Sequence, residues 1–85
     1  MNYVRYEVTI KYTRHPFDKF GEPVKDKTEV TTWFDTIYQE SKRPLSEMVA
    51  KAIAKRRFME KMSHIKINTI RAVKQTYKDA TKTWV

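Results

Sequence analysis

The sequence predicts a small single-domain α+β protein with the element order strand, strand, helix, strand (β-β-α-β). Residues 3–13 and 63–77 alternate apolar and polar side chains, whereas residues 44–62 repeat their apolar side chains at helical spacing. Alternation is typical of a strand with one buried face, and the longer period is typical of an amphipathic helix. We therefore expect a three-stranded, antiparallel-rich sheet with one basic amphipathic helix packed on one face. The 85 residues suffice for one domain, residues 1–85, with a thin core.

The first strand is expected over residues 3–13, where the alternation is cleanest. β-Branched and aromatic side chains occupy every second position, which suits a pleated surface with one buried face. This apolar set consists of Val4, Tyr6, Val8, Ile10 and Tyr12.

A long loop is expected over residues 14–24. It contains two of the three prolines and the only glycine of the chain, and neither residue type fits the interior of a strand. Because hairpin loops usually have about two to five residues, this one is long, and long ordered loops often carry function. We expect Phe17 and Phe20 to fold back onto the end of the sheet, with exposed contact residues as the alternative.

The second strand is expected over residues 27–38. Trp33 and Ile37 fall on one face, and we expect another part of the chain to cover them. A short helical turn over residues 36–42 is the alternative for the end of this segment. The other face combines Val30, Thr32, Phe34, Thr36 and Tyr38.

The helix is expected over residues 44–62. Pro44 suits a first turn, where its missing N–H would be unpaired anyway, and Ser46 is a competing N-cap. Arg56 falls within the apolar stripe, so we expect its methylene groups to lie on the core with the charge at the rim. At about 100° per residue, the predicted stripe consists of Leu45, Met48, Val49, Ala52, Ile53 and Met59.

The third strand is expected over residues 63–77. Its apolar residues change phase partway along, which predicts a bulge near Thr69 and Ile70. A helix is the alternative for this segment. The tail, residues 79–85, is short and mostly polar, so we expect it to fray.

The charge of the chain is concentrated in its second half. Residues 1–40 contain six Lys or Arg and seven Asp or Glu, whereas residues 41–85 contain twelve and three, giving net charges of −1 and +9. A short chain with its basic residues in one half is typical of a protein that binds something acidic.

The function expected from this asymmetry is non-enzymatic binding of nucleic acid, with RNA slightly favoured over DNA, because phosphate backbones are the commonest acidic partner of a basic patch. Phe58 is placed among the lysines, where it could stack on an unpaired base; its alternative is packing under the tail or in a dimer interface. A merely solvated surface is the alternative for the patch. The predicted binding residues are Lys51, Lys55, Arg57, Phe58, Lys61, Lys66, Arg71 and Lys74.

Two other function classes remain open. In the first, the basic half docks on an acidic protein, as an accessory factor, an inhibitor of a nucleic-acid enzyme or an antitoxin would. The second is a small metal-free ribonuclease, in which His64, Arg71 and Tyr77 would move the proton and stabilise the transition state.

The sequence also predicts several absences. Without cysteine there is no thiolate zinc site, and with a single glycine there is no glycine-rich phosphate loop, so neither a metal nor a cofactor is expected. No signal peptide or apolar run of membrane-spanning length is visible, so we expect a cytoplasmic protein. A homodimer through an edge strand is compatible with the long alternating segments.

Overall fold

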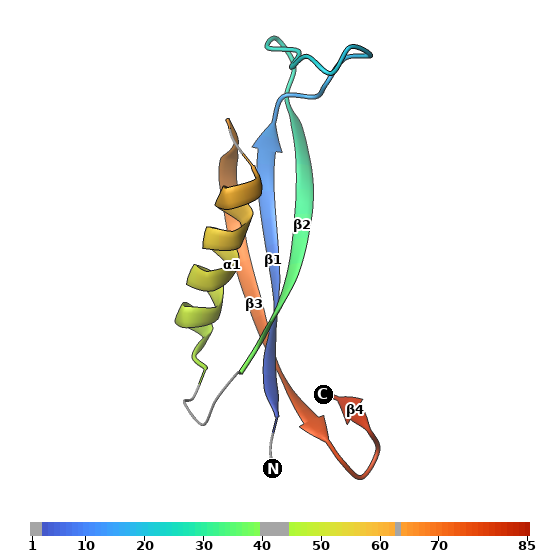
Figure 1. Cartoon of the computed structure of the whole chain (residues 1–85), viewed down its shortest axis with the longest axis vertical. Coiled ribbons are helices and arrows are strands. Elements are labelled where there is room, and N and C mark those ends of the chain that lie inside the picture. Colours follow the sequence, from blue (N-terminus) through green and yellow to red (C-terminus); the bar gives the residue numbers. More distant parts are fainter. Residues whose placement is uncertain (1–2, 40–44, 63) are drawn as a thin grey trace.

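The chain folds into a curled antiparallel sheet with a helix lying along it (Figure 1). The structure is a computed structural model that describes residues 3–39, 45–62 and 64–85. Its elements are β1 (Val4–Arg14), β2 (Glu29–Tyr38), α1 (Glu47–Lys61), β3 (Lys66–Lys78) and β4 (Thr83–Trp84). The predicted α+β class is therefore confirmed, whereas the predicted three strands become four because the tail adds β4.

The strands are arranged in the order β2-β1-β3-β4, and every neighbouring pair is antiparallel. The first strand therefore lies inside the sheet, with β2 on one side and β3 on the other. The connection through α1 carries the chain back over the sheet, which places β3 beside β1. β2 is an edge strand of ten residues.

The core lies between α1 and the face of the sheet that it covers. The even-numbered side chains of β1 from Tyr6 to Tyr12 are buried there, as their alternation predicted. From the helix, Ala50, Ala54 and Phe58 are fully buried. The two alanines are small enough to let the helix backbone approach the sheet, and Phe58 fills the core toward the C-terminal end of α1 with one large side chain.

The predicted apolar stripe of the helix is borne out only in part: Leu45 and Ile53 pack against the core, whereas its other members are exposed. Met48, Val49 and Met59 are about half or more exposed, because the buried side of α1 follows the four-residue spacing of Ala50, Ala54 and Phe58. The helix thus carries apolar side chains on two sides, and the stripe chosen from the sequence mostly faces outward. Arg56 is likewise exposed instead of lying on the core.

The helix begins after the competing N-cap, Ser46. The Ser46 hydroxyl oxygen accepts a hydrogen bond from the Val49 N–H at 3.2 Å, and Glu47 adds a carboxylate to the first turn. Both interactions stabilise the start of a helix. The role predicted for Pro44 falls outside the described residues. α1 is the one helix among the described residues. With 15 residues and many charges, it is neither long nor apolar enough to cross a membrane.

The second strand divides into two faces as predicted, and α1 covers the face with Trp33 and Ile37. Ile37 is buried and Trp33 packs against the core. Phe34, at 71% exposure, and Val30, at 67%, lie on the opposite face. The strand predicted up to Tyr38 is confirmed, so the alternative of a helical turn is wrong over residues 36–38, and residues 40–42 are outside the described part of the chain.

The third strand contains the predicted bulge, one residue earlier than expected. Lys11 pairs with Thr69 while the next residue, Tyr12, pairs with Ile67, which leaves Asn68 as the extra residue. The bulge explains the change of phase, since it turns both Ile67 and Ile70 toward the helix. The Asn68 side-chain amide donates a hydrogen bond to the Thr13 hydroxyl at 2.8 Å.

The tail does not fray as predicted, because it folds back and pairs with the end of β3. The Thr76 N–H donates to the Val85 carbonyl at 2.8 Å, and the Val85 N–H donates to the Thr76 carbonyl at 3.0 Å. The Trp84 ring then packs on Tyr77, with 5.3 Å between ring centroids. This aromatic contact provides the apolar anchor that a short polar tail otherwise lacks.

The loop after β1 is ordered by its own hydrogen bonds. The Asp18 carboxylate accepts from the N–H groups of Phe20 and Glu22 at 2.8 and 2.9 Å, and Gly21 takes a φ of 78°, which favours glycine. Phe17 and Phe20 are 61% and 78% exposed, so they do not fold back onto the sheet as expected. The loop forms one tip of a molecule about 51 Å long (Figure 1).

Candidate nucleic-acid interface

The face of the sheet opposite α1, here called the open face, carries no described helix or loop, and at its β4 end the Trp84 ring lies over Arg5. β1 contributes its odd-numbered side chains to this face, and the register assigns the matching side chains of β2 and β3. Its aromatic and charged members in these three strands are Arg5, Glu7, Lys11, Phe34, Tyr38, Lys66, Arg71 and Tyr77.

An exposed aromatic ring lies at the middle of the open face. Phe34 pairs across β2 with Thr9, and Thr9 pairs across β1 with Arg71. Neighbouring strands are about 4.8 Å apart, so the backbones of Phe34 and Arg71 are about 10 Å apart with a small side chain between them. Two residues further along β1, on the same face, Lys11 lies between Thr32 of β2 and Thr69 of β3. The centre of this face therefore combines an apolar ring with two cations.

The cations at the centre of the open face are not neutralised by the rest of the described chain. Arg71, Lys11 and Lys66 form no ion pair with any described residue. The described strands place one carboxylate on this face, Glu7, and it lies 3.7 Å from Arg5 and accepts a hydrogen bond from the Thr36 hydroxyl at 3.3 Å. The open face is therefore positively charged, with its single carboxylate already engaged.

A cluster of rings around Arg5 lies at the β4 end of the open face. The guanidinium carbon of Arg5 is 4.1 Å from the centroid of the Trp84 ring and 6.0 Å from that of Tyr38. The Arg5 Nε donates to Gln75 Oε1 at 2.7 Å, which holds the side chain in place. Tyr3 packs edge-on against Tyr77 at the margin of the cluster. Cations and aromatic rings thus lie near one another at both the centre and this end of the face, and at this end the Arg5 side chain is held by its neighbours.

Phe58 is not the stacking residue that the sequence suggested. It is fully buried, with its ring 4.8 Å from that of Tyr12 and 5.5 Å from that of Trp33. The most exposed aromatic residue of the three strands on the open face is instead Phe34, which the sequence analysis had placed in a strand without assigning it a role. The missed signal was that Phe34 and Trp33 are adjacent, so only one of them could be buried under a single helix.

The predicted basic patch is divided between the two sides of the sheet, so it is not one continuous surface. Lys66 and Arg71 lie on the open face, whereas Lys74 lies on the helix side, opposite Tyr6. On the helix, Lys51 pairs with Glu47 at 3.1 Å, and Arg57 pairs with Asp35 of β2 at 3.4 Å. These two cations are partly neutralised.

Lys55 is exposed on the outward side of α1 and forms no ion pair with a described residue. Lys61 lies in the last helical turn, where it lines a cleft at the loop end of the molecule. Neither belongs to the open face, because α1 lies on the other side of the sheet.

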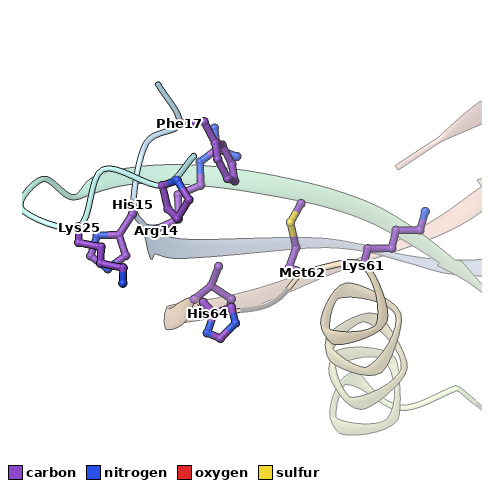
Figure 2. A pocket seen from close by; sticks show the side chains of 9 residues that line it. Arg14, His15, Phe17, Lys25, Lys61, Met62 and His64 are labelled. Carbon is purple, nitrogen blue, oxygen red and sulfur yellow. The ribbon is translucent and has the colours of Figure 1, made fainter. Parts of the chain in front are cut away.

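This cleft, here called the basic cleft, has a volume of about 600 Å³ and lies between the loop and the end of α1 (Figure 2). The described polar side chains that line it are all basic: Arg14, His15, Lys25, Lys61 and His64. Its apolar lining comes from Phe17, Pro23, Met62 and Ile65. The cleft brings together the two histidines of the chain, which are 49 residues apart in sequence.

Two of these basic side chains are held by neighbouring groups. The His15 Nδ1 lies 2.8 Å from the Lys27 carbonyl oxygen. The Arg14 Nε donates to Glu29 Oε1 at 2.7 Å, and this hydrogen bond raises the pKa of the Arg14 guanidinium. His64 has a φ of 56°, in the left-handed region that a non-glycine residue seldom adopts.

The residues suggested for a ribonuclease do not meet. His64 lies in the basic cleft, Arg71 at the centre of the open face and Tyr77 in the aromatic cluster at the far end of β3. The six residues from Arg71 to Tyr77 span about 20 Å of strand. These three side chains therefore cannot act on one phosphodiester.

The described residues contain no group of three or more His, Asp or Glu side chains that could hold a metal ion. Comparison of the chain with protein-family models, with curated protein sequences and with solved structures finds no match.

Proposed function

We propose that this chain binds single-stranded nucleic acid, RNA ahead of DNA, on the open face of its sheet. The observation that carries the proposal is the row Phe34, Thr9 and Arg71, in which an exposed ring and an unneutralised cation flank a small residue. A base can stack on the ring while the phosphate next to it meets the cation.

The residue types and the strand lengths support a single strand as the ligand. An aromatic ring accepts any base, because every base has a π-face, and stacking contributes about 1–3 kcal/mol per base. The strands are ten or more residues long, so the open face extends beyond one nucleotide in length. Lys11 and Lys66 lie along it in the direction of the loop, where they can contact further phosphates.

A duplex fits this surface less well. Reading a major groove usually requires a helix or a two-stranded ribbon that enters it, and α1 lies on the side of the sheet away from the open face. RNA is placed ahead of DNA because its recognition commonly targets loops and ends whose bases are already unpaired.

The test is a binding titration of a short single-stranded RNA with Phe34→Ala. Loss of one stacking site should weaken binding about tenfold, which is about 1.4 kcal/mol. Phe20→Ala is the matched control, because Phe20 is equally exposed but lies in the loop. Equal affinity of the two variants would show that the open face is not the binding surface.

An acidic protein is the second candidate partner, and the outward side of α1 favours it. Met48, at 81% exposure, and Met59, at 50%, line this side together with Ala52. Lys55 and Arg56 flank the apolar residues and would suit carboxylates around an apolar contact. In that case the functional surface would be the helix, and Phe34→Ala would leave binding of the partner unchanged.

A further inference from the structure

We infer that the basic cleft is a second ligand site, which binds the phosphate group of a nucleotide. This site lies at the loop end of the molecule, on the helix side of the sheet, and shares no residue with the open face. The inference therefore does not rest on the function proposed for the open face.

The basic side chains that line the cleft favour a negatively charged ligand. Lys25 and Lys61 are exposed lysines that form no ion pair with a described residue, and none of the described residues that line the cleft is a carboxylate. Arg14 is the exception, because Glu29 already accepts its Nε–H. Two ammonium groups and two imidazoles thus remain to contact a ligand, which suits a phosphate because it can accept several hydrogen bonds at once.

The apolar part of the lining indicates which kind of molecule would carry the phosphate group. Phe17, Pro23, Met62 and Ile65 contribute apolar surface within the same cleft. Inorganic phosphate would leave this surface exposed to water, whereas a planar base could pack on it. The Arg14 guanidinium carbon lies over the Phe17 ring, 5.9 Å from its centroid, and Phe17 is still 61% exposed, so apolar ring surface remains available to a ligand beside a cation. A nucleotide combines both chemical requirements.

The positions of the side chains support contacts from two elements. Figure 2 shows His15, Arg14 and Lys25 on the loop side and His64 across from them, at the start of β3, while the Lys61 side chain extends away from the His64 ring. We therefore assign the first phosphate contacts to Lys25 and the imidazoles, with Lys61 at the margin. Because the His15 Nδ1–H donates to the Lys27 carbonyl, Nε2 is the ring nitrogen left to meet a ligand, and it can donate to a phosphate oxygen only when the imidazole is protonated.

The experiment follows the two histidine signals by proton NMR while adenosine 5′-monophosphate is added to the full chain. The chain has only two histidines, so each imidazole proton signal can be assigned from His15→Gln and His64→Gln. Both signals are expected to shift and to saturate with one dissociation constant. If neither signal moves at millimolar nucleotide, the inference is wrong.

Two ligand controls separate the parts of the inference. Adenosine without phosphate should cause at most one-tenth of the shift, and equal binding of adenosine would overturn the role of the phosphate. Inorganic phosphate should bind at least tenfold more weakly than the nucleotide, and equal binding would overturn the role of the base. An RNA tetramer with and without a 5′-phosphate then distinguishes a strand end from a free nucleotide as the source of the group.

Charge-reversal variants locate the site. Lys25→Glu/Lys61→Glu should weaken nucleotide binding at least tenfold, whereas Lys55→Glu/Lys78→Glu changes the net charge equally at positions outside the cleft and should have little effect. All four side chains are exposed, so both variants should fold. Equal losses would indicate a nonspecific charge effect and contradict the inference. Phe34→Ala should leave the histidine shifts unchanged, which distinguishes failure here from failure of the open-face proposal.

Discussion

At the scale of single residues, two phenylalanines of similar chemistry have opposite positions. Phe58 is fully buried between two rings, whereas Phe34 is 71% exposed. The pattern of the sequence suggested an exposed position for Phe58, because it has charged neighbours along the chain, and it assigned no role to Phe34. Neighbours along the chain do not determine which side of an element faces the core.

This difference predicts the stability of two matched variants. Phe58→Ala should lower the free energy of unfolding by about 3–5 kcal/mol, since it removes a buried ring and leaves a cavity. Phe34→Ala should change it by about 0.5 kcal/mol or less, because an exposed ring loses few contacts. Chemical denaturation followed by circular dichroism measures both, and similar losses for the two would contradict the assigned burial.

At the scale of elements, the alternation of β1 and the helical spacing of α1 were readable because they are local properties of the chain. The orientation of α1 was not readable from them. Ala50 and Ala54 contribute little to an apolar stripe judged by residue size, yet they face the sheet because small side chains permit close packing. Met48 and Met59 dominate the pattern and lie outside the core.

Two helix alanines test this orientation. Ala54→Leu should destabilise the fold by about 1–3 kcal/mol, because a larger side chain must fit against β1 without free space. Ala52→Leu makes the same chemical change on the exposed side and should be nearly neutral, since leucine is also a good helix former. Thermal unfolding of the two variants gives the comparison, and a larger loss for Ala52→Leu would mean that the helix is rotated.

At the scale of the whole molecule, the charge asymmetry along the sequence does not become one positive patch in space. β3 contributes cations to both faces of the sheet: Arg71 lies on the open face and Lys74 on the helix side, because side chains alternate along a strand. The sequence therefore predicted a basic surface but could not assign its residues to the two faces of the sheet. The described structure instead yields an open sheet face and a basic cleft at one end.

The salt dependence of RNA binding on the open face distinguishes a nucleic-acid partner from a protein partner. Each phosphate neutralised on a single strand contributes about −0.7 to the log–log slope of affinity against salt. With three free cations, Lys11, Lys66 and Arg71, we expect a slope of about −2 for a short single-stranded RNA, reduced by about 0.7 in Arg71→Gln. A flat dependence that Arg71→Gln does not change would argue for a protein partner.

By itself the sequence determined the α+β class, the position of each long element, the loop, the bulge to within one residue and the basic character of the second half. These are properties of short stretches, in which residue spacing records which side chains share a face. The tertiary structure decided which face of α1 is buried, that α1 is the element that covers Trp33 and Ile37, that the tail pairs with β3, and that His15 and His64 line one cleft. These features depend on contacts between residues far apart in the chain, whose energies no local spacing reports.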